Sequence, residues 1–345
     1  MGSLQEGKTG GDDWRGDACA RAGIPWLTFT DRVRLSSEKL ARVFTRSDNL
    51  QYLESNTRVM MKSMKEAKDG DQDEDQILVE FRVFVSDDSV QKSISLTQSR
   101  DDVALIIDGA GIGTPEAREC VVATVVIYLP SVLHHLIVDV DHADITVQKL
   151  SVRMHTLELH ALSGAIAVLD SLMSLTRLHV AIVHGTFQTT GGVEAHEQDV
   201  CVQRGSIEGN LTLGHSTMIY VVTGSVNTHL CAIPEIPSLG RESRTVEIHN
   251  REGSVHLTVS SQPDLKVLVL GDLTNVTIRV PETSSAAIAL ATRNGSIAYP
   301  SSLTIVTDHR GNFSREIVGY LGDGTKKDPE LTSSVVTGSL SLVSI

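Results

Sequence analysis

Gly253–Val259 reads Gly-Ser-Val-His-Leu-Thr-Val, which is a pair of small turn residues followed by an alternating apolar and polar run. Glycine adopts a positive φ angle at no steric cost, so it suits a sharp corner in the chain. Val255, Leu257 and Val259 then fall on one face of an extended strand, and polar side chains fall on the other. The stretch therefore predicts a corner followed by a β-strand with one buried face.

The same Gly-Ser-aliphatic unit recurs through the second half of the chain. Copies begin at Gly205, Gly224, Gly253, Gly295 and Gly338, and related units begin at Gly164 and Gly185. Successive glycines are separated by 21, 20, 19, 29, 42 and 43 residues, and the last two steps are close to twice the first three. A regular period of this size is typical of stacked copies of one small unit.

We therefore predict an all-β fold, a parallel β-solenoid in which the seven glycines are structural turn residues and the serines after them form a ladder of hydroxyls. A β-sandwich with similar hairpin spacing is the alternative, but sandwich turns rarely repeat one tripeptide at one period. The composition agrees with a solenoid, because 41% of the residues are hydrophobic and only 4% are aromatic. Narrow stacked layers accommodate aliphatic side chains more readily than large rings.

The first part of the chain has a different pattern. Residues 1–35 are predicted to be a disordered or loosely ordered tail. Residues 36–75 are predicted to be a helical segment, from the spacing of Leu40, Val43 and Phe44, followed by the acidic linker Lys68–Asp75. The β-solenoid repeat domain is then expected over residues 77–345.

The charge balance excludes some classes of partner. The chain has a formal net charge of −13, from 30 basic and 43 acidic residues, whereas nucleic-acid binding needs a basic surface. The longest apolar run, Cys120–Leu129, is too short to cross a bilayer, so no membrane span is expected. The sequence therefore predicts that the partner is a protein or a glycan and that the chain does not bind nucleic acid.

The sequence also bears on the compartment. No apolar signal segment follows Met1, and the four cysteines include no Cys-x-x-Cys pair, so a cytoplasmic location is expected. Four glycosylation sequons keep an extracellular location open; they begin at Asn210, Asn275, Asn294 and Asn312.

Part of the repeat region resembles a known family. Gly205–Leu213, followed by Ile219–Asn227, looks like a fungal domain of unknown function whose members share the rhythm of glycine-serine-aliphatic, strand, and threonine-x-glycine-serine. Val126–Pro130 and His135–Val140 resemble the entry strands of that domain. The resemblance covers roughly residues 77–345 and implies a β-solenoid.

The C-terminal part resembles a second group. Gly322–Gly324, and then Val336–Leu342, is similar to the closing coil of adhesin-like β-solenoid domains of bacteria. Neither family has an active-site motif that could be transferred, so the resemblance implies no catalytic residues.

One acidic cluster could carry chemistry. Asp139, Asp141 and Asp144 lie close together in the sequence, and calcium is bound by several carboxylate oxygens. We identify them as candidate metal ligands, and calcium is the only cofactor that the sequence leaves open. The other interpretation is a solvated strand end followed by a turn in which aspartate binds its own backbone.

Three functions follow from these patterns. The leading hypothesis is a non-catalytic interaction or structural module that presents a polar ladder to a protein or a glycan. The second is a carbohydrate-active enzyme, a calcium-dependent polysaccharide lyase that uses Asp139, Asp141 and Asp144. The third is an adhesin-like surface protein, in which the sequons would be used.

Overall fold

The structure is a computed structural model of the 345-residue chain. It describes residues 27–36, 40–48, 53–67, 76–85, 88–108, 119–148, 150–169, 172–190, 193–231, 244–260, 265–284, 286–322 and 330–345. These residues are almost entirely β-strand, with one 3₁₀ turn, η1 (Met64–Glu66), and one five-residue helix, α2 (Asp88–Lys92). The chain divides into two compact units, Met1–Leu172 and Met173–Ile345.

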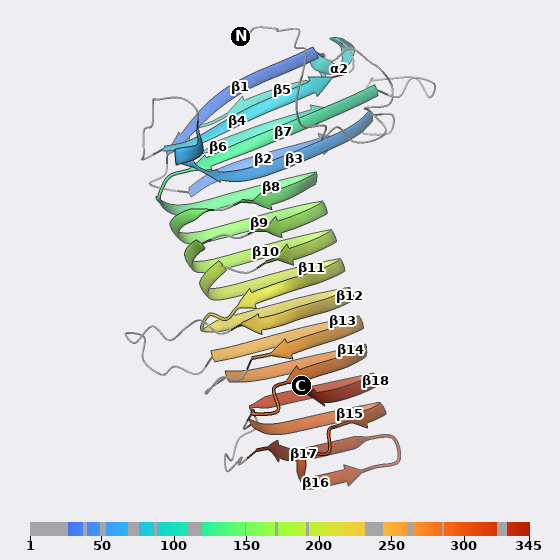
Figure 1. Cartoon of the computed structure of the whole chain (residues 1–345). Coiled ribbons are helices and arrows are strands. Elements are labelled where there is room, and N and C mark those ends of the chain that lie inside the picture. The colour runs from blue at the N-terminus through green and yellow to red at the C-terminus, as the bar shows by residue number, and fades with distance from the viewer. Residues whose placement is uncertain are drawn as a thin grey trace. The chain divides into compact units, whose positions relative to one another are not determined.

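The strands of the first unit are β1 (Leu27–Ser36), β2 (Leu40–Asp48), β3 (Leu53–Ser63), β4 (Gln76–Val85), β5 (Ile94–Gln98), β6 (Asp102–Asp108), β7 (Glu119–Leu129), β8 (Val132–Val147) and β9 (Ser151–Val168). The strands of the second unit are β10 (Leu172–Thr189), β11 (Val193–Thr212), β12 (Ser216–Cys231), β13 (Arg244–Val259), β14 (Leu265–Val280), β15 (Ala286–Ala298), β16 (Thr304–Arg310), β17 (Arg315–Leu321) and β18 (Leu331–Ser344). The long strands each turn through a corner and so have a first and a second arm (Figure 1). This arrangement confirms the predicted all-β solenoid.

In the first unit, strand pairing extends from both arms of β8. The first arm of β8 pairs in parallel with β2, which pairs with β6, and β6 pairs in antiparallel fashion with β5. The second arm of β8 pairs in parallel with β3, which pairs with β7, and antiparallel pairs then lead to β4 and β1. The coil made of β2 and β3 therefore lies between β8 and the coil made of β6 and β7, although both of those follow it in the sequence.

The predicted helix over Ser36–Lys68 is wrong, because this segment contains β2 and β3. Ala41, Val43 and Thr45 are buried and alternate with more exposed residues, which is the period of a strand. Pairing with β6 and β8 on both edges of β2 decides the conformation, because strand preference depends on such tertiary neighbours.

The boundaries expected for this region also need correction. Residues 27–35 of the expected tail belong to β1, and residues 1–26 lie outside the described residues. The acidic linker Lys68–Asp75 also lies outside them. Strands that precede residue 77 pair with β4, β6, β7 and β8, so the β region begins earlier than predicted.

The second unit is a stack with one strand for each coil. Strands β10 to β14 pair in parallel and in sequence order, and their corners align Gly185, Gly205, Gly224 and Gly253. The next strand in space is β18, which is followed by β15 (Figure 1). The antiparallel hairpin of β17 and β16 pairs with the far edge of β15 and ends the unit.

This order explains the two long glycine steps. Thr274 of β14 stands opposite Gly253, so the 42-residue step contains one coil that has no glycine at the aligned position. The 43-residue step arises because the chain passes through β16 and β17 before β18 aligns Gly338 with Gly295. The 29-residue step contains residues 232–243, which lie outside the described residues.

The corner itself requires glycine where coils meet closely. Gly224 has a φ angle of 147°, which L side chains rarely adopt. A Cβ atom added at Gly224 would fall on the carbonyl oxygen of Gly205 in the preceding coil, far inside van der Waals contact. The repeated glycine therefore allows both the sharp turn and the close approach of neighbouring backbones.

Aliphatic ladders fill the space between the two arms. Ile219, Ile248 and Val269 are neighbours on successive first arms, and Val226 and Val255 are neighbours on second arms. All five side chains are buried. Burial of such apolar area is the main source of stability in a thin core, at roughly 25 cal/mol per Å². No helix among the described residues is long and apolar enough to span a bilayer.

Candidate functional site

The second arms of the second unit present a ladder of polar side chains on their outer face. The row directly after the corner comprises Thr186, Ser206, Ser225, Ser254, Asn275, Ser339 and Ser296, in spatial order. The next outward row comprises Gln188, Glu208, Asn227, His256, Thr277, Ser341 and Ala298. We call these two rows the polar ladder; neighbouring members are one strand apart, about 4.8 Å.

Some ladder members bind one another. Ser206 Oγ lies 2.9 Å from Glu208 Oε1 and 3.3 Å from Thr186 Oγ1. Asn275 Oδ1 accepts hydrogen bonds from the Ser339 hydroxyl at 2.9 Å and from the Ser339 backbone N–H at 3.0 Å. These contacts hold the side chains in fixed positions along the stack.

Other ladder members keep their hydrogen-bonding capacity. Within the described part of the chain, the side chains of Ser225, Ser254 and Ser296 make no hydrogen bond to protein, and a hydroxyl can both donate and accept. The inward residues Val226 and Val255, which alternate with this row, are fully buried. The free hydroxyls are therefore held on a rigid surface, which reduces the entropy lost when a ligand binds.

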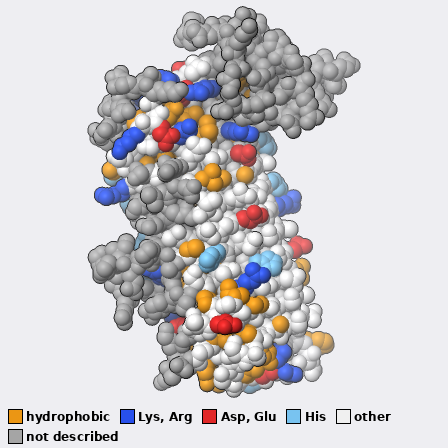
Figure 2. Space-filling view, viewed as in Figure 1, with side chains coloured by type: hydrophobic (Ala, Val, Ile, Leu, Met, Phe, Trp, Pro, Cys, Tyr) orange, Lys and Arg blue, Asp and Glu red, His pale blue; other side chains and the backbone are white. Residues whose placement is uncertain are grey.

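The polar ladder is almost uncharged. Charged residues make up 21% of the sequence, but Glu208 is the one Asp, Glu, Lys or Arg in the two rows. Figure 2 shows a face of the molecule on which charged side chains are scattered singly among uncharged ones. A ligand of this surface therefore needs hydroxyl and amide groups more than charge.

The first arms of the same unit present a different outer face. Met218 and Tyr220 on β12 are 45% and 41% exposed, and the Tyr220 ring lies 6.4 Å from the ring of His249 on β13. His249 Nε2 lies 2.6 Å from Glu247 Oε1. Sequence reasoning missed this surface, although a tyrosine at an outward strand position in a chain with few aromatic residues was a usable signal.

A thiol lies beside this surface. Cys201 is aligned with Tyr220, and it is free and half-buried. Burial raises the pKa of the Cys201 thiol, and the negative charge of Asp199 raises it further. A thiol with a raised pKa is a poor nucleophile, so Cys201 is suited to packing rather than to chemistry.

The structure brings two of the three candidate calcium ligands together, but around an arginine. Arg46 on β2 donates from Nη1 to Asp141 Oδ1 at 2.8 Å and from Nη2 to Asp139 Oδ2 at 3.0 Å. The Ser47 backbone N–H donates to the second oxygen of Asp141 at 3.1 Å. Burial lowers the pKa of Arg46, but the hydrogen bond to Asp141 and the charges of both carboxylates outweigh it, and the net pKa is raised.

Asp144 has a different partner. Its Oδ1 accepts a hydrogen bond from the Ala165 backbone N–H at 2.8 Å, beside the corner glycine Gly164. Ala165 belongs to β9, 21 residues further along the chain, so this contact joins neighbouring coils and differs from the alternative interpretation, in which aspartate binds its own backbone at a turn. No group of three or more His, Cys, Asp or Glu residues in the described ranges is arranged to hold a metal ion.

A second carboxylate network lies in the first unit. Glu80 on β4 is buried; its carboxylate accepts hydrogen bonds from Arg82 Nε at 2.8 Å and from the Tyr128 hydroxyl at 3.5 Å. Tyr128 packs against Met64 of η1. Burial raises the pKa of Tyr128, and the charge of Glu80 raises it further. These residues join β4, β7 and η1.

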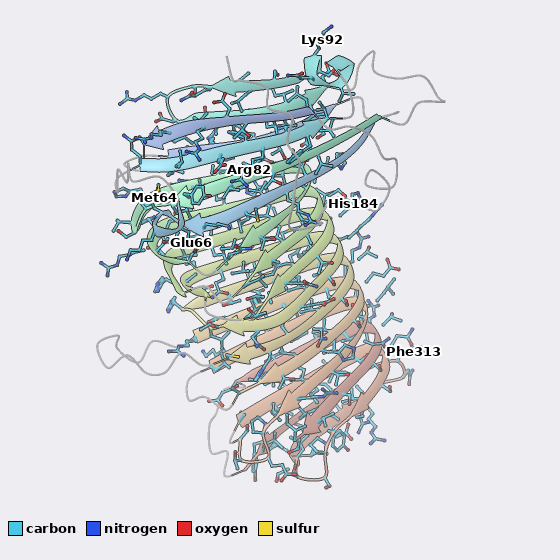
Figure 3. All side chains as sticks on the ribbon, turned by 45° about the horizontal axis from the view of Figure 1, so that its top comes forward. Met64, Glu66, Arg82, Lys92, His184 and Phe313 are labelled. Atoms are coloured by element: carbon cyan, nitrogen blue, oxygen red, sulfur yellow. The ribbon has the colours of Figure 1, made fainter. Side chains whose placement is uncertain are left out.

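The end of the second unit is closed by a charged cluster. Arg315 on β17 donates from Nε and Nη2 to Asp308 on β16, each at 3.0 Å, and from Nη1 to the Ile297 carbonyl oxygen of β15 at 3.5 Å. Charge at a strand edge prevents pairing with other chains. Phe313 lies at the tip of this hairpin, is 79% exposed, and points away from the stack (Figure 3).

No protein-family model matches this chain, and no curated protein matches it in sequence. Among solved structures, it is similar to a "putative lipid binding protein" from Parabacteroides distasonis, with 8% identity over 92% of this chain and 96% of that chain and a TM-score of 0.46. It is also similar to a "putative adhesin" from Bacteroides fragilis, with 9% identity over 92% of this chain and 97% of that chain and a TM-score of 0.35.

A "putative adhesin" from Parabacteroides distasonis is similar at 12% identity over 73% of this chain and 93% of that chain, with a TM-score of 0.28. The expected similarity to adhesin-like proteins of bacteria is thus found at very low identity. The resemblance to a fungal domain stays a prediction. Similarities with TM-scores below 0.5 at such identities do not indicate a function for this chain, and its own surfaces have to be considered instead.

Proposed function

We propose that this chain is a non-catalytic binding module whose polar ladder binds a neutral, hydroxyl-rich glycan. The observation that carries the proposal is the alignment of two rows of mostly uncharged polar side chains on β10 to β15 and β18. Sugar hydroxyls donate and accept hydrogen bonds, as the serine and threonine hydroxyls and the amides of the ladder do. A repeated spacing along the stack suits a repeating polymer.

The titratable groups of the ladder support a non-catalytic role. They are Glu208 and His256, and Asn227 lies between them on the intervening strand. Two strand spacings separate them by about 10 Å. The ladder therefore offers one carboxylate, which already lies 2.9 Å from the Ser206 hydroxyl, and one imidazole two strands away.

A charge-insertion experiment tests the proposal. Ser225→Arg with Ser254→Arg places two long cations on the ladder at neighbouring positions, without touching the buried face. Binding to soluble neutral polysaccharides, measured with heparin as the charged comparison, should be lost in this variant. The matched control is Ser216→Arg with Thr245→Arg, which makes the same change on the first arms of the same two strands.

The control variant should bind as the unchanged protein does. Equal loss in both variants would mean that the effect comes from net charge and not from the ladder. If the unchanged protein binds no neutral polysaccharide and instead retains a defined protein that the ladder variant loses and the control variant keeps, the ladder is a protein-binding surface.

The sequons offer a second test of the same surface. Asn275 belongs to the polar ladder, and the exposed side chain of Asn210 lies on the same arm, one outward position beyond Glu208. A glycan attached at Asn275 would cover the ladder and support the adhesin-like alternative at the expense of glycan binding. Intact mass of protein from its native source shows directly whether hexose has been added.

A further inference from the structure

The second unit contains a site that is filled by a strand out of sequence order. β18 lies between β14 and β15 and runs parallel to both. On β18, Leu340 is the neighbour of Val276 on one side and of Ile297 on the other. We call the space between β14 and β15 the β18 slot.

Both walls of the β18 slot precede its occupant in the chain. Until β18 arrives, β14 and β15 each present an unpaired row of backbone N–H and C=O groups to the slot. Such open edges bind any strand that has suitable register. The register is set by aligned backbones and by alternating inward residues, and a second copy of this chain carries the same strand.

The side of β18 that faces the core buries a hydroxyl that lacks a hydrogen-bond partner. Ser333 is 0% exposed, and its Oγ has no hydrogen-bond partner among the described residues. Its neighbours across the two interfaces are Val269 and Leu290, which are both buried and apolar. Burying a hydroxyl without a partner costs free energy that an aliphatic residue would not cost.

A second hydroxyl with the same defect faces β18. Thr292 on β15 is buried, is aligned with Val335, and has no partner for Oγ1 in the described residues. Elsewhere in the described part of this unit, the comparable buried hydroxyls are those of Thr217 and Thr228. Two of these four groups are therefore found in the interface between β18 and β15.

We propose that the β18 slot is a strand-binding site that also accepts β18 from a second copy of this chain, so that two copies form a strand-exchanged dimer. Exchange of an identical element between copies is a common route to dimers. The connection between β17 and β18 has nine residues, 322–330, and can extend over about 30 Å at most. The proposal does not depend on the function of the polar ladder.

Cross-linking between distinguishable copies tests this exchange in the full chain. Leu268 on β14 and Thr332 on β18 are neighbours at half-exposed outward positions. ¹⁵N-labelled Leu268→Cys protein is mixed with unlabelled Thr332→Cys protein, and a short bismaleimide is added after incubation. Mass spectrometry of the linked peptides identifies the two cysteines and the copy from which each one came.

The matched control uses neighbours within the stack. Met218→Cys and Glu247→Cys occupy aligned outward positions on β12 and β13, which follow one another in chain order. We expect mixed-isotope links between positions 268 and 332 to exceed those between 218 and 247 at least tenfold, and to increase with protein concentration. Equal yields in the two mixtures would overturn the proposal.

The double variant Leu268→Cys with Thr332→Cys shows whether the two positions react. If it links within its own copy while the mixed single variants do not link, β18 stays in its own chain and the proposal fails. If the double variant does not link at all, β18 does not lie beside β14 and the proposal fails as well.

The buried hydroxyl gives an independent measurement. Ser333→Val removes the unpaired Oγ, and we expect it to slow exchange roughly tenfold, which corresponds to a barrier to release of β18 that is higher by about 1.4 kcal/mol. Ser341→Val is the matched control, because it makes the same change at an outward position of the same strand. Ser333→Ala removes the hydroxyl without adding volume. If neither Ser333→Val nor Ser333→Ala slows exchange relative to Ser341→Val, β18 is not weakened at Ser333, and that step of the inference is wrong.

Discussion

The hydroxyl of Thr274 donates a hydrogen bond to the backbone carbonyl oxygen of Asn250 at 2.8 Å and also lies 3.1 Å from Asn250 Oδ1. Both residues are buried at adjacent corners of the second unit. Asn250 Nδ2 in turn donates to the Gly224 carbonyl oxygen at 3.2 Å. One coil thus has Thr274 where the others have the corner glycine; its own glycine, Gly271, lies three residues earlier, where a Cβ atom would meet the Thr274 side chain.

We expect Thr274→Val to destabilise the protein by about 1–2 kcal/mol, because a buried oxygen of Asn250 loses its donor while the shape of the side chain is kept. Urea denaturation monitored by circular dichroism gives the free energy of unfolding. Thr277→Val, at an outward position of the same strand, is the control and should change it by less than about 0.5 kcal/mol. Similar effects in both variants would contradict the role assigned to the Thr274 hydroxyl.

Gly224→Ala should destabilise the protein by about 3 kcal/mol or prevent folding. The added Cβ atom meets the Gly205 carbonyl oxygen, and the φ angle of 147° is unfavourable for alanine. The neighbouring change Ser225→Ala removes only an outward hydroxyl and serves as the control. The measurement is the melting temperature of both variants. A Gly224→Ala protein with the melting temperature of the unchanged chain would show that the corner can open to admit the Cβ atom.

The Asp308 cluster predicts a pH dependence. Hydrogen bonds from Arg315, and then from Arg310, hold the pKa of Asp308 well below its usual value. A carboxyl whose pKa is lower in the folded state contributes stability above its unfolded pKa of about 3.9, and this contribution is lost as the pH falls toward the folded value. Asp308→Asn should therefore melt at a lower temperature than the unchanged protein at neutral pH.

The difference in melting temperature between these two proteins should shrink as the pH is lowered below about 3.9. Because the cluster is at the surface, the difference should also become smaller at high salt. A difference that stays constant from neutral to acidic pH would mean that the loss comes from packing and not from the charge of Asp308.

Calcium should leave the melting temperature unchanged at millimolar concentration. Arg46 and the Ser47 backbone N–H already occupy oxygens of Asp139 and Asp141, and Asp144 binds Ala165. A ligand that binds only the folded state would raise the melting temperature by mass action. A rise with calcium that Asp141→Ala abolishes would restore the calcium site and, with it, the lyase hypothesis.

Local patterns in the sequence were enough to predict the solenoid. Gly224-Ser225-Val226 and its copies specify a corner and the two faces of the following strand, and these features depend on neighbouring residues alone. The outward serine row follows from the same alternation. This is why the candidate surface was predictable from the sequence, although no single residue in it is distinctive.

The missed features depend on partners that are distant in the chain. Ala41, Val43 and Thr45 form a strand because β6 and β8 lie on both sides of it, which no local spacing reveals. Thr274 stands at a corner and binds Asn250 of the preceding coil, and the glycine pattern alone does not reveal this coil. Arg46 is 93 residues from Asp139, and the ion pair that engages this carboxylate could not be predicted from the acidic cluster alone.

The place of β18 in the stack also imposes a delay on folding during translation, because β14 is synthesised well before the strand that pairs with it. The 64 residues from Val280 at the end of β14 to Ser344 at the end of β18 take roughly 3–13 s to translate at 5–20 residues per second. During that interval the nascent chain carries a finished strand with an unpaired edge, next to which β15 must not settle. The order in which β15 and β18 reach the free edge of β14 therefore decides whether the coils stack correctly.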